Sequence, residues 1–174
     1  MTPPSTPLSR RGWLALLARG AAAASALTLL GRDASAALAT GATSGATDAP
    51  PTPIMVHKDA SCGCCEHWVT HLRANGFQPT VRDEKSMETV KQTLGVPAAL
   101  QSCHTAVVGG YLVEGHVPAA DIRRMLATRP KIVGLAVPGM VTGSPGMEMP
   151  GRAAEKYDVL AFDAAGKTRV FAKH

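Results

Sequence analysis

Runs of apolar residues separated by polar turns divide most of the chain into short strands and helices. An apolar run over 53–58 predicts a first strand. Asp59 or Ser61 is expected to cap the helix that follows, and Asn75-Gly76 is expected to end it. Its apolar face recurs at i, i+3, i+4 and i+7 and consists of Cys65, Trp68, Val69 and Leu72.

The pattern of strands and helices continues beyond this first pair. A strand over 77–81 is followed by a helix over 86–94, which a Ser-x-Glu pattern opens. Two apolar runs on either side of Gly109-Gly110 predict a β-hairpin with a two-residue turn. Pro118 then stands at the first turn of a further helix, over 118–129.

The last part of the chain predicts a long loop and a second hairpin. Residues 132–151 hold five glycines, three prolines and three methionines, and we expect an ordered loop there. Apolar runs over 157–162 and 168–172 flank a turn and close the chain as a hairpin. The order strand, helix, strand, helix, hairpin, helix predicts an α/β fold: a thioredoxin-like sandwich with a central mixed β-sheet, flanking helices and a C-terminal β-hairpin.

The beginning of the chain has the features of an export signal. Ser9-Arg10-Arg11-Gly12-Trp13-Leu14 is a twin-arginine pattern, and the alanine- and leucine-rich run after it ends at a small-x-small cleavage site. We therefore expect a twin-arginine signal peptide over 1–39, a disordered linker over 40–52 and one periplasmic domain over 53–174. The alternative is an uncleaved membrane anchor, which Arg19 and the many alanines disfavour.

Charge and hydropathy exclude two classes of partner. The whole chain has a formal net charge of +5, but removal of residues 1–39 takes away four arginines and one aspartate and leaves about +2. Most of the basic character thus belongs to the signal, so no nucleic-acid partner is expected. No segment after the signal is long and apolar enough to span a bilayer, so no membrane partner is expected after cleavage.

The candidate chemistry lies in four cysteines. Cys62, Cys64 and Cys65 fall at the start of the first predicted helix, where the helix dipole and the free N–H groups favour thiolates and lower their pKa. Cys103 stands at the start of the first hairpin, which a thioredoxin-like fold would place beside that helix start. All four sulfurs could then converge.

Four kinds of site are considered for these cysteines. Cys62 and Cys65 form a C-x-x-C pair typical of thiol–disulfide exchange, but Cys64 between them would offer wrong partners. Structural zinc also takes four sulfurs, but these usually come from two C-x(2–4)-C pairs. A site of four thiolates and one Zn²⁺ would in addition keep a net charge of −2. Four Cu⁺ ions would balance the four thiolates, and soft sulfur ligands select Cu(I). Two structural disulfides are the remaining alternative in an exported protein.

Several blocks of sequence occur in a fixed order around these cysteines. They are 57–65, 102–106, 115–119, 134–140, 143–148 and 157–159, with Trp68, His71-Leu72 and Gly76-Phe77. Together they resemble the signature of the CopG-type copper-resistance proteins over about residues 53–174. Members of that family often have Tyr and Pro where this chain has His57 and Ala60, and neither of these is a cysteine.

The resemblance implies a thioredoxin-like fold, periplasmic copper handling and a cysteine-bridged multicopper cluster, and it leaves Cu(I)/Cu(II) redox activity open. The matching cysteines are Cys62, Cys64, Cys65 and Cys103. Three further candidates come from residue type. His104 could bind the metal itself, or it could form a hydrogen bond to a residue that binds the metal. Met140 and Met147 offer thioethers that bind Cu(I), or they cap the core. His67 and His71 are interpreted as surface residues, and His116 as a structural residue that could lie near the site.

The leading hypothesis is therefore a periplasmic copper-binding protein of copper resistance. It would hold Cu(I), with zinc disfavoured, and its partners would be copper ions together with a periplasmic copper chaperone, an efflux system or an electron donor. Copper oxidoreductase activity stays open. The first alternative is a thiol–disulfide oxidoreductase that uses Cys62 and Cys65. The second is a disulfide-stapled interaction module.

Overall fold

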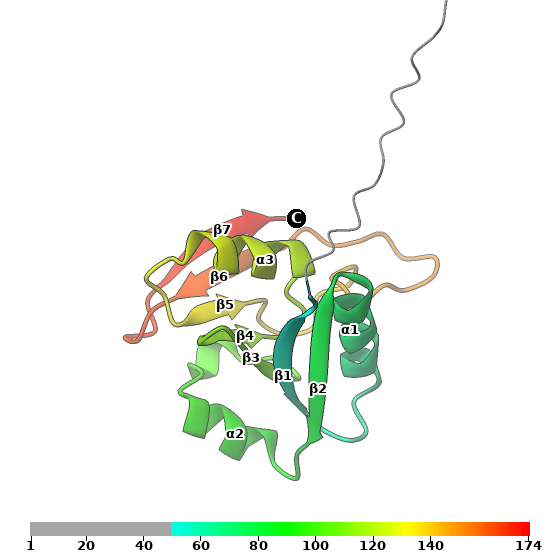
Figure 1. Cartoon of the computed structure of the whole chain (residues 1–174). Coiled ribbons are helices and arrows are strands. Elements are labelled where there is room, and N and C mark those ends of the chain that lie inside the picture. The colour runs from blue at the N-terminus through cyan, green and yellow to red at the C-terminus, as the bar shows by residue number, and fades with distance from the viewer. Residues whose placement is uncertain (1–49) are drawn as a thin grey trace, which may run out of the picture. The chain divides into compact units, whose positions relative to one another are not determined.

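A seven-stranded sheet organises residues 50–174, which are the residues that the computed structural model describes (Figure 1). The strands are β1 (Thr52–Lys58), β2 (Phe77–Asp83), β3 (Thr105–Val108), β4 (Tyr111–Glu114), β5 (Gly134–Ala136), β6 (Asp158–Phe162) and β7 (Thr168–Lys173). The helices are α1 (Gly63–Ala74), α2 (Met87–Leu94), the short 3₁₀ helix η1 (Ala98–Leu100) and α3 (Ala119–Thr128). The strand order is β2-β1-β3-β4-β5-β6-β7.

The sheet is mixed, as predicted. β1 pairs in parallel with β2, and β4 pairs in parallel with β5, whereas the other neighbouring strands are antiparallel. The order of elements along the chain is the one predicted for a thioredoxin-like sandwich. It is β1, α1, β2, α2, the β3–β4 hairpin and α3. The α/β class, the flanking helices and the closing β6–β7 hairpin are confirmed.

Apolar side chains pack in one cluster on each face of the sheet. Leu112 and Val113 are successive residues of β4, so their side chains point to opposite faces, and they belong to different clusters. The larger cluster packs α1 and α3 against the sheet and includes Trp68 and Ile122. The smaller cluster packs the segment after α2 against the other face, through Leu100. The sheet is thereby covered on both faces.

Short-range sequence signals explain the predicted helix and hairpin boundaries. Ser86 caps α2 by accepting a hydrogen bond from the backbone N–H of Thr89 at 3.3 Å, and Gly95 ends the helix in the left-handed region, with φ of 74°. Gly109 and Gly110 have φ of 56° and 87°, and positive φ at both central residues is what a tight two-residue hairpin turn needs.

Three local predictions were wrong. The N-cap of α1 is Cys62, whose side chain makes no capping hydrogen bond, instead of Asp59 or Ser61. β2 extends two residues beyond the predicted end at Val81. The segment 132–151 is not wholly a loop, because Gly134–Ala136 forms β5 between β4 and β6. Three residues in a glycine- and proline-rich stretch are too few to give a strand pattern.

Most of the predictions for the N-terminal part of the chain fall outside the described residues. The predicted signal over 1–39 and most of the linker over 40–52 lie outside them, and β1 begins at Thr52. Among the helices of residues 50–174, none has the length and apolar character needed to cross a membrane.

Candidate metal centre

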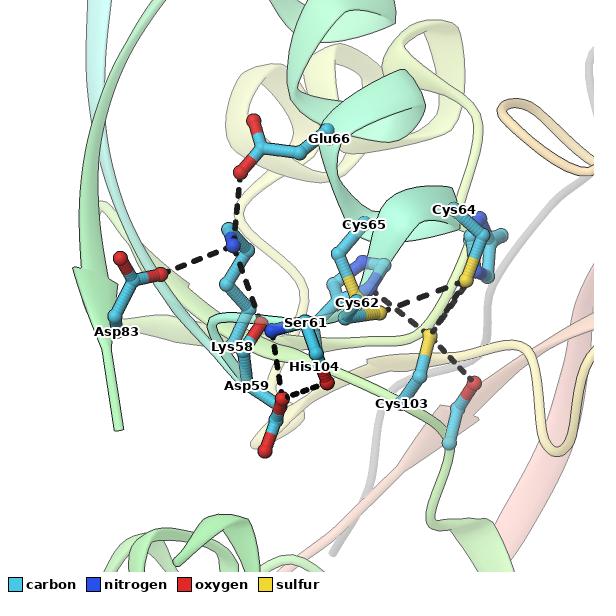
Figure 2. Close-up of a disulfide and its surroundings, with 12 residues drawn as sticks. Lys58, Asp59, Ser61, Cys62, Cys64, Cys65, Glu66, Asp83, Cys103 and His104 are labelled. Carbon is cyan, nitrogen blue, oxygen red and sulfur yellow. Dashed lines mark hydrogen bonds and ion pairs between the residues drawn. A yellow bond between two sulfur atoms is a disulfide. The ribbon is translucent and has the colours of Figure 1, made fainter. Parts of the chain in front are cut away.

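The centre begins at the junction between β1 and α1. The Asp59 carboxylate accepts hydrogen bonds from the backbone N–H and the hydroxyl of Ser61, at 2.8 and 2.5 Å, and these bonds lower the pKa of Asp59. This turn delivers the chain to Cys62 at the start of α1 (Figure 2). Cys65 is fully buried against the core, while Cys62 and Cys64 stay partly exposed.

Sheet pairing brings Cys103 to the same place. β3 pairs with β1, with Thr105 opposite His57, so the residues just before β3 lie beside the turn that follows β1. The Cys64 sulfur lies 3.6 Å from the Cys62 sulfur and 3.8 Å from the Cys103 sulfur (Figure 2). All four cysteine sulfurs lie within 4.8 Å of one another. The predicted convergence is therefore present.

The cysteines are partly oxidised in this structure. A disulfide joins Cys62 to Cys65, and Cys64 and Cys103 are free thiols (Figure 2). The chain's four cysteines all lie in the described region, so this differs from the alternative with two structural disulfides. Two of the four predicted ligands need reduction before they can bind metal.

Two histidines point nitrogens at the Cys103 sulfur. His104 Nδ1 lies 3.3 Å from it and His116 Nε2 lies 3.1 Å from it. The other ring nitrogen of His116, Nδ1, is 2.8 Å from the Pro145 carbonyl oxygen, which can only accept a hydrogen bond. The neutral His116 ring therefore carries its proton on Nδ1 and presents the Nε2 lone pair to Cys103. Metal-binding histidines are commonly oriented in this way.

Sequence reasoning allowed His116 to lie near the site but did not name it as a ligand. The two-residue turn fixes the register of the hairpin, with Thr105 opposite Glu114. Continuing this register two positions beyond the strands sets residue 116 opposite residue 103. The signal was thus present in the predicted hairpin, but it required counting back from the turn.

Burial controls the protonation of these groups. It raises the pKa of the Cys103 thiol to about 12, and the nearby Cys64 adds to the effect. Burial also lowers the pKa of His116. It lowers the pKa of His104 to well below the ordinary value for histidine. Lowered thiol pKa values were predicted for the helix start, but Cys103 lies on no helix. The centre therefore holds neutral imidazoles, and a metal ion must displace the Cys103 proton.

The loop between β5 and β6 covers part of the centre. Gly146 packs closely on α1. A Cβ added to it would lie 2.6 Å from the backbone nitrogen of Trp68 and 3.0 Å from the backbone oxygen of Cys64. Met147 follows it and is half-buried, whereas Met140 is 63% exposed, which excludes Met140 from capping the core. Copper binding by these two methionines remains a prediction.

A buried charge network supports the segment that carries Cys103. The Glu114 carboxylate is fully buried and accepts hydrogen bonds from Lys91 Nζ at 2.5 Å and from the Ser102 backbone N–H at 2.7 Å. The Thr105 hydroxyl donates to its other oxygen at 2.6 Å. One side chain therefore holds the residues on either side of Cys103 and His104.

A second buried cation supports the α1 side. Lys58 at the end of β1 is 1% exposed and forms ion pairs with Glu66 of α1 at 2.8 Å and with Asp83 of β2 at 2.9 Å (Figure 2). The hydrogen bond to Glu66 is the main cause of its raised pKa. The first turn of α1, with its cysteines, is thereby tied to the edge of the sheet.

Comparison with known proteins agrees with this geometry. Residues 100–147 match a family described as a protein of unknown function, DUF411. The chain is similar to two solved structures named copper resistance protein CopG, form 2 and form 1, with 51% and 52% sequence identity. Each match has a TM-score of 0.67 and covers 71% of this chain and 98% of the other. The search of curated proteins gave no match. With half of the aligned residues identical over 98% of each of those chains, this chain belongs to the CopG family of copper resistance proteins.

Proposed function

We propose that this protein acts in copper resistance by holding Cu(I) in a multinuclear cluster bridged by Cys62, Cys64, Cys65 and Cys103. The observation that carries the proposal is the convergence of the four sulfurs within 4.8 Å. Copper is the cargo of such a protein. His104 Nδ1 and His116 Nε2 lie beside the cluster, at 3.3 and 3.1 Å from the Cys103 sulfur.

The arrangement of the sulfurs favours several small soft ions over one zinc ion. Cys64 and Cys65 are adjacent on α1, where successive side chains point about 100° apart. This suits bridging between ions better than surrounding one ion. Soft thiolates select Cu(I), and each Cu⁺ neutralises one thiolate, so a multinuclear cluster leaves little net charge in a partly buried site.

Loading requires the Cys62–Cys65 disulfide to open. Its reduction consumes two electrons and two protons and yields two thiols, and an external thiol reductant can supply both. Each thiol then loses its proton to solvent as copper binds. Once bound, the ions keep the sulfurs from forming the disulfide again.

Cu(I) titration of the reduced protein without oxygen, against a chromogenic chelator, tests this function. We expect more than one Cu(I) per chain in the reduced protein and fewer when the disulfide is closed. Cys103→Ser and Cys64→Ser should lower the stoichiometry. His67→Ala is the matched control, because His67 is an exposed histidine of the same helix. Binding of a single ion, or preference for Zn²⁺ in competition, would refute the cluster.

We also propose that the protein works in the periplasm. The support is the twin-arginine pattern at Arg10-Arg11 and the similarity to copper resistance proteins. Replacing both arginines by lysine should leave the full-length chain in the cytoplasm, whereas the unchanged chain should be recovered shortened from the periplasmic fraction. Equal export of both chains would refute this signal.

A second function, thiol–disulfide exchange, is favoured by the disulfide itself. Cys62 is partly exposed at the start of α1 and its partner Cys65 is fully buried, which gives an accessible attacking sulfur and a protected resolving sulfur. This function predicts disulfide reduction without metal that persists in Cys103→Ser and is lost in Cys62→Ser. Absence of turnover in the metal-free reduced protein would exclude it.

A further inference from the structure

We propose that Cys103, His104 and His116 form a second metal site, which takes one divalent transition-metal ion of borderline softness and shares the Cys103 sulfur with the copper cluster. The three ligand atoms lie within 4.8 Å of one another. The separations from the sulfur are 3.3 Å to His104 Nδ1 and 3.1 Å to His116 Nε2. Two ligands of one zinc ion can lie up to about 4.4 Å apart, the sum of typical Zn–S and Zn–N bond lengths.

The orientation of both rings is fixed before any ion arrives. The Pro145 carbonyl holds the proton of His116 on Nδ1, so Nε2 faces Cys103 as a lone pair. His104 packs against Trp68 at a tilt of 36°, with 4.3 Å between ring centroids, and meets the His116 ring edge-on at 4.9 Å. Both histidines are fully buried. A site with ligands held in this way loses little conformational entropy on binding.

His104 is costly to bury unless it binds something. Its Nε2 has no hydrogen-bond partner among the described residues, and its ring is met by the Cys103 sulfur at Nδ1 and by the Gly115 backbone. A thiol is a weak hydrogen-bond partner, so this ring forgoes much of the hydrogen bonding that water would give it. A metal ion on Nδ1 would form a stronger bond than the thiol does, with the ring proton then on Nε2.

The donor set differs in kind from the four sulfurs. Two imidazole nitrogens and one thiolate suit Zn²⁺, Co²⁺ and Cu²⁺, whereas an all-sulfur set selects Cu(I). The second site also uses none of the disulfide-bonded sulfurs, because Cys103 stays a free thiol when Cys62 and Cys65 are joined. The disulfide form, which lacks a complete copper cluster, should therefore still bind a divalent ion.

The test is a Co²⁺ titration of the metal-free protein with the disulfide closed. We expect one Co²⁺ per chain, a thiolate-to-metal charge-transfer band, and displacement by Zn²⁺. His116→Gln and His104→Gln should weaken Co²⁺ binding by more than about 100-fold, and Cys103→Ser should remove the band. His67→Gln, on an exposed ring, should leave both unchanged.

Cys64→Ser separates this site from the copper cluster. Cys64 belongs to the four sulfurs but is not one of the three ligands, so the variant should lower Cu(I) stoichiometry and keep the Co²⁺ band. Near-ultraviolet circular dichroism identifies any variant that has lost its fold, and X-ray absorption at the cobalt edge then counts the nitrogen neighbours of the unchanged protein. Co²⁺ binding that survives both histidine changes, depends on Cys64, or shows a shell of sulfur alone would overturn the second site.

Discussion

The carboxylate of Glu114 accepts the backbone N–H of Ser102 at 2.7 Å, so a fully buried side chain of β4 holds the residue before Cys103. The same oxygen pairs with Lys91 of α2. We predict that Glu114→Ala lowers the free energy of unfolding by about 3–5 kcal/mol, because Lys91 is left buried without its counter-charge. Denaturant unfolding measures this change.

The double variant Lys91→Met/Glu114→Leu separates stability from positioning. Removing both charges should restore much of the lost free energy of unfolding, since a buried ion pair is often replaceable by apolar residues. The hydrogen bond to Ser102 stays absent, so the affinity for Cu(I) should remain below that of the unchanged protein. Wild-type copper affinity in the double variant would show that Glu114 does not position Cys103.

The close packing of Gly146 on α1 gives a second prediction. Gly146→Ala should destabilise the protein by about 1–3 kcal/mol, because its Cβ would meet the backbone of Trp68 and Cys64. It should also displace Pro145 and weaken metal binding by His116. Gly151→Ala is the control: Gly151 lies in the same loop with a similar φ of 77° and open space around its Cβ position. Equal losses in both variants would mean that backbone strain alone is responsible.

Stability should depend on pH through three histidines. Burial lowers the pKa of His71, His104 and His116, so these rings stay neutral in the folded metal-free protein where the unfolded chain becomes protonated. The unfolded state then binds more protons, and the free energy of unfolding should fall as the pH decreases from about 6.5 to about 5. Denaturant unfolding at a series of pH values measures the slope.

His71→Gln offers a control for the pH effect. His71 Nε2 accepts the backbone N–H of Ala119 at 3.1 Å, and a glutamine oxygen can accept the same bond without titrating. The variant should therefore be folded and show a shallower dependence on pH in this range. An unchanged slope would remove His71 from the explanation.

Trp68 should report metal binding. Its ring packs at a tilt against His104, and its Nε1 donates to the Val117 carbonyl at 2.9 Å, which holds the indole beside the centre. The chain's other tryptophan is Trp13, which lies in the proposed signal, so the protein without residues 1–39 has Trp68 as its single tryptophan. Its fluorescence should decrease as Cu(I) is added to the reduced protein and stop changing at the binding stoichiometry. If the fluorescence of Trp68 does not change when Cu(I) is added, the metal binds away from His104.

The four sulfurs could be predicted as neighbours because three of them are close in the sequence and the expected thioredoxin-like order places the start of the hairpin beside the first helix. The glycine pair of the hairpin and the β1–α1 junction both depend on residues close in the chain. His116 was not named as a ligand because its place depends on pairing register, not on local pattern. Lys91 and Glu114 were missed because charged residues are seldom buried, and only the fold shows that these two meet.

The pairing of β5 with β6 has a consequence for how this protein family can diverge. These strands are hydrogen-bonded neighbours, yet residues 137–157 leave the sheet between them to reach the metal centre and return. The pairing of β5 with β6 is made outside residues 137–157 and does not use them. Changes in the length or composition of this segment can therefore alter access to the metal, or the ligands offered to it, while the scaffold that gathers the cysteines stays intact.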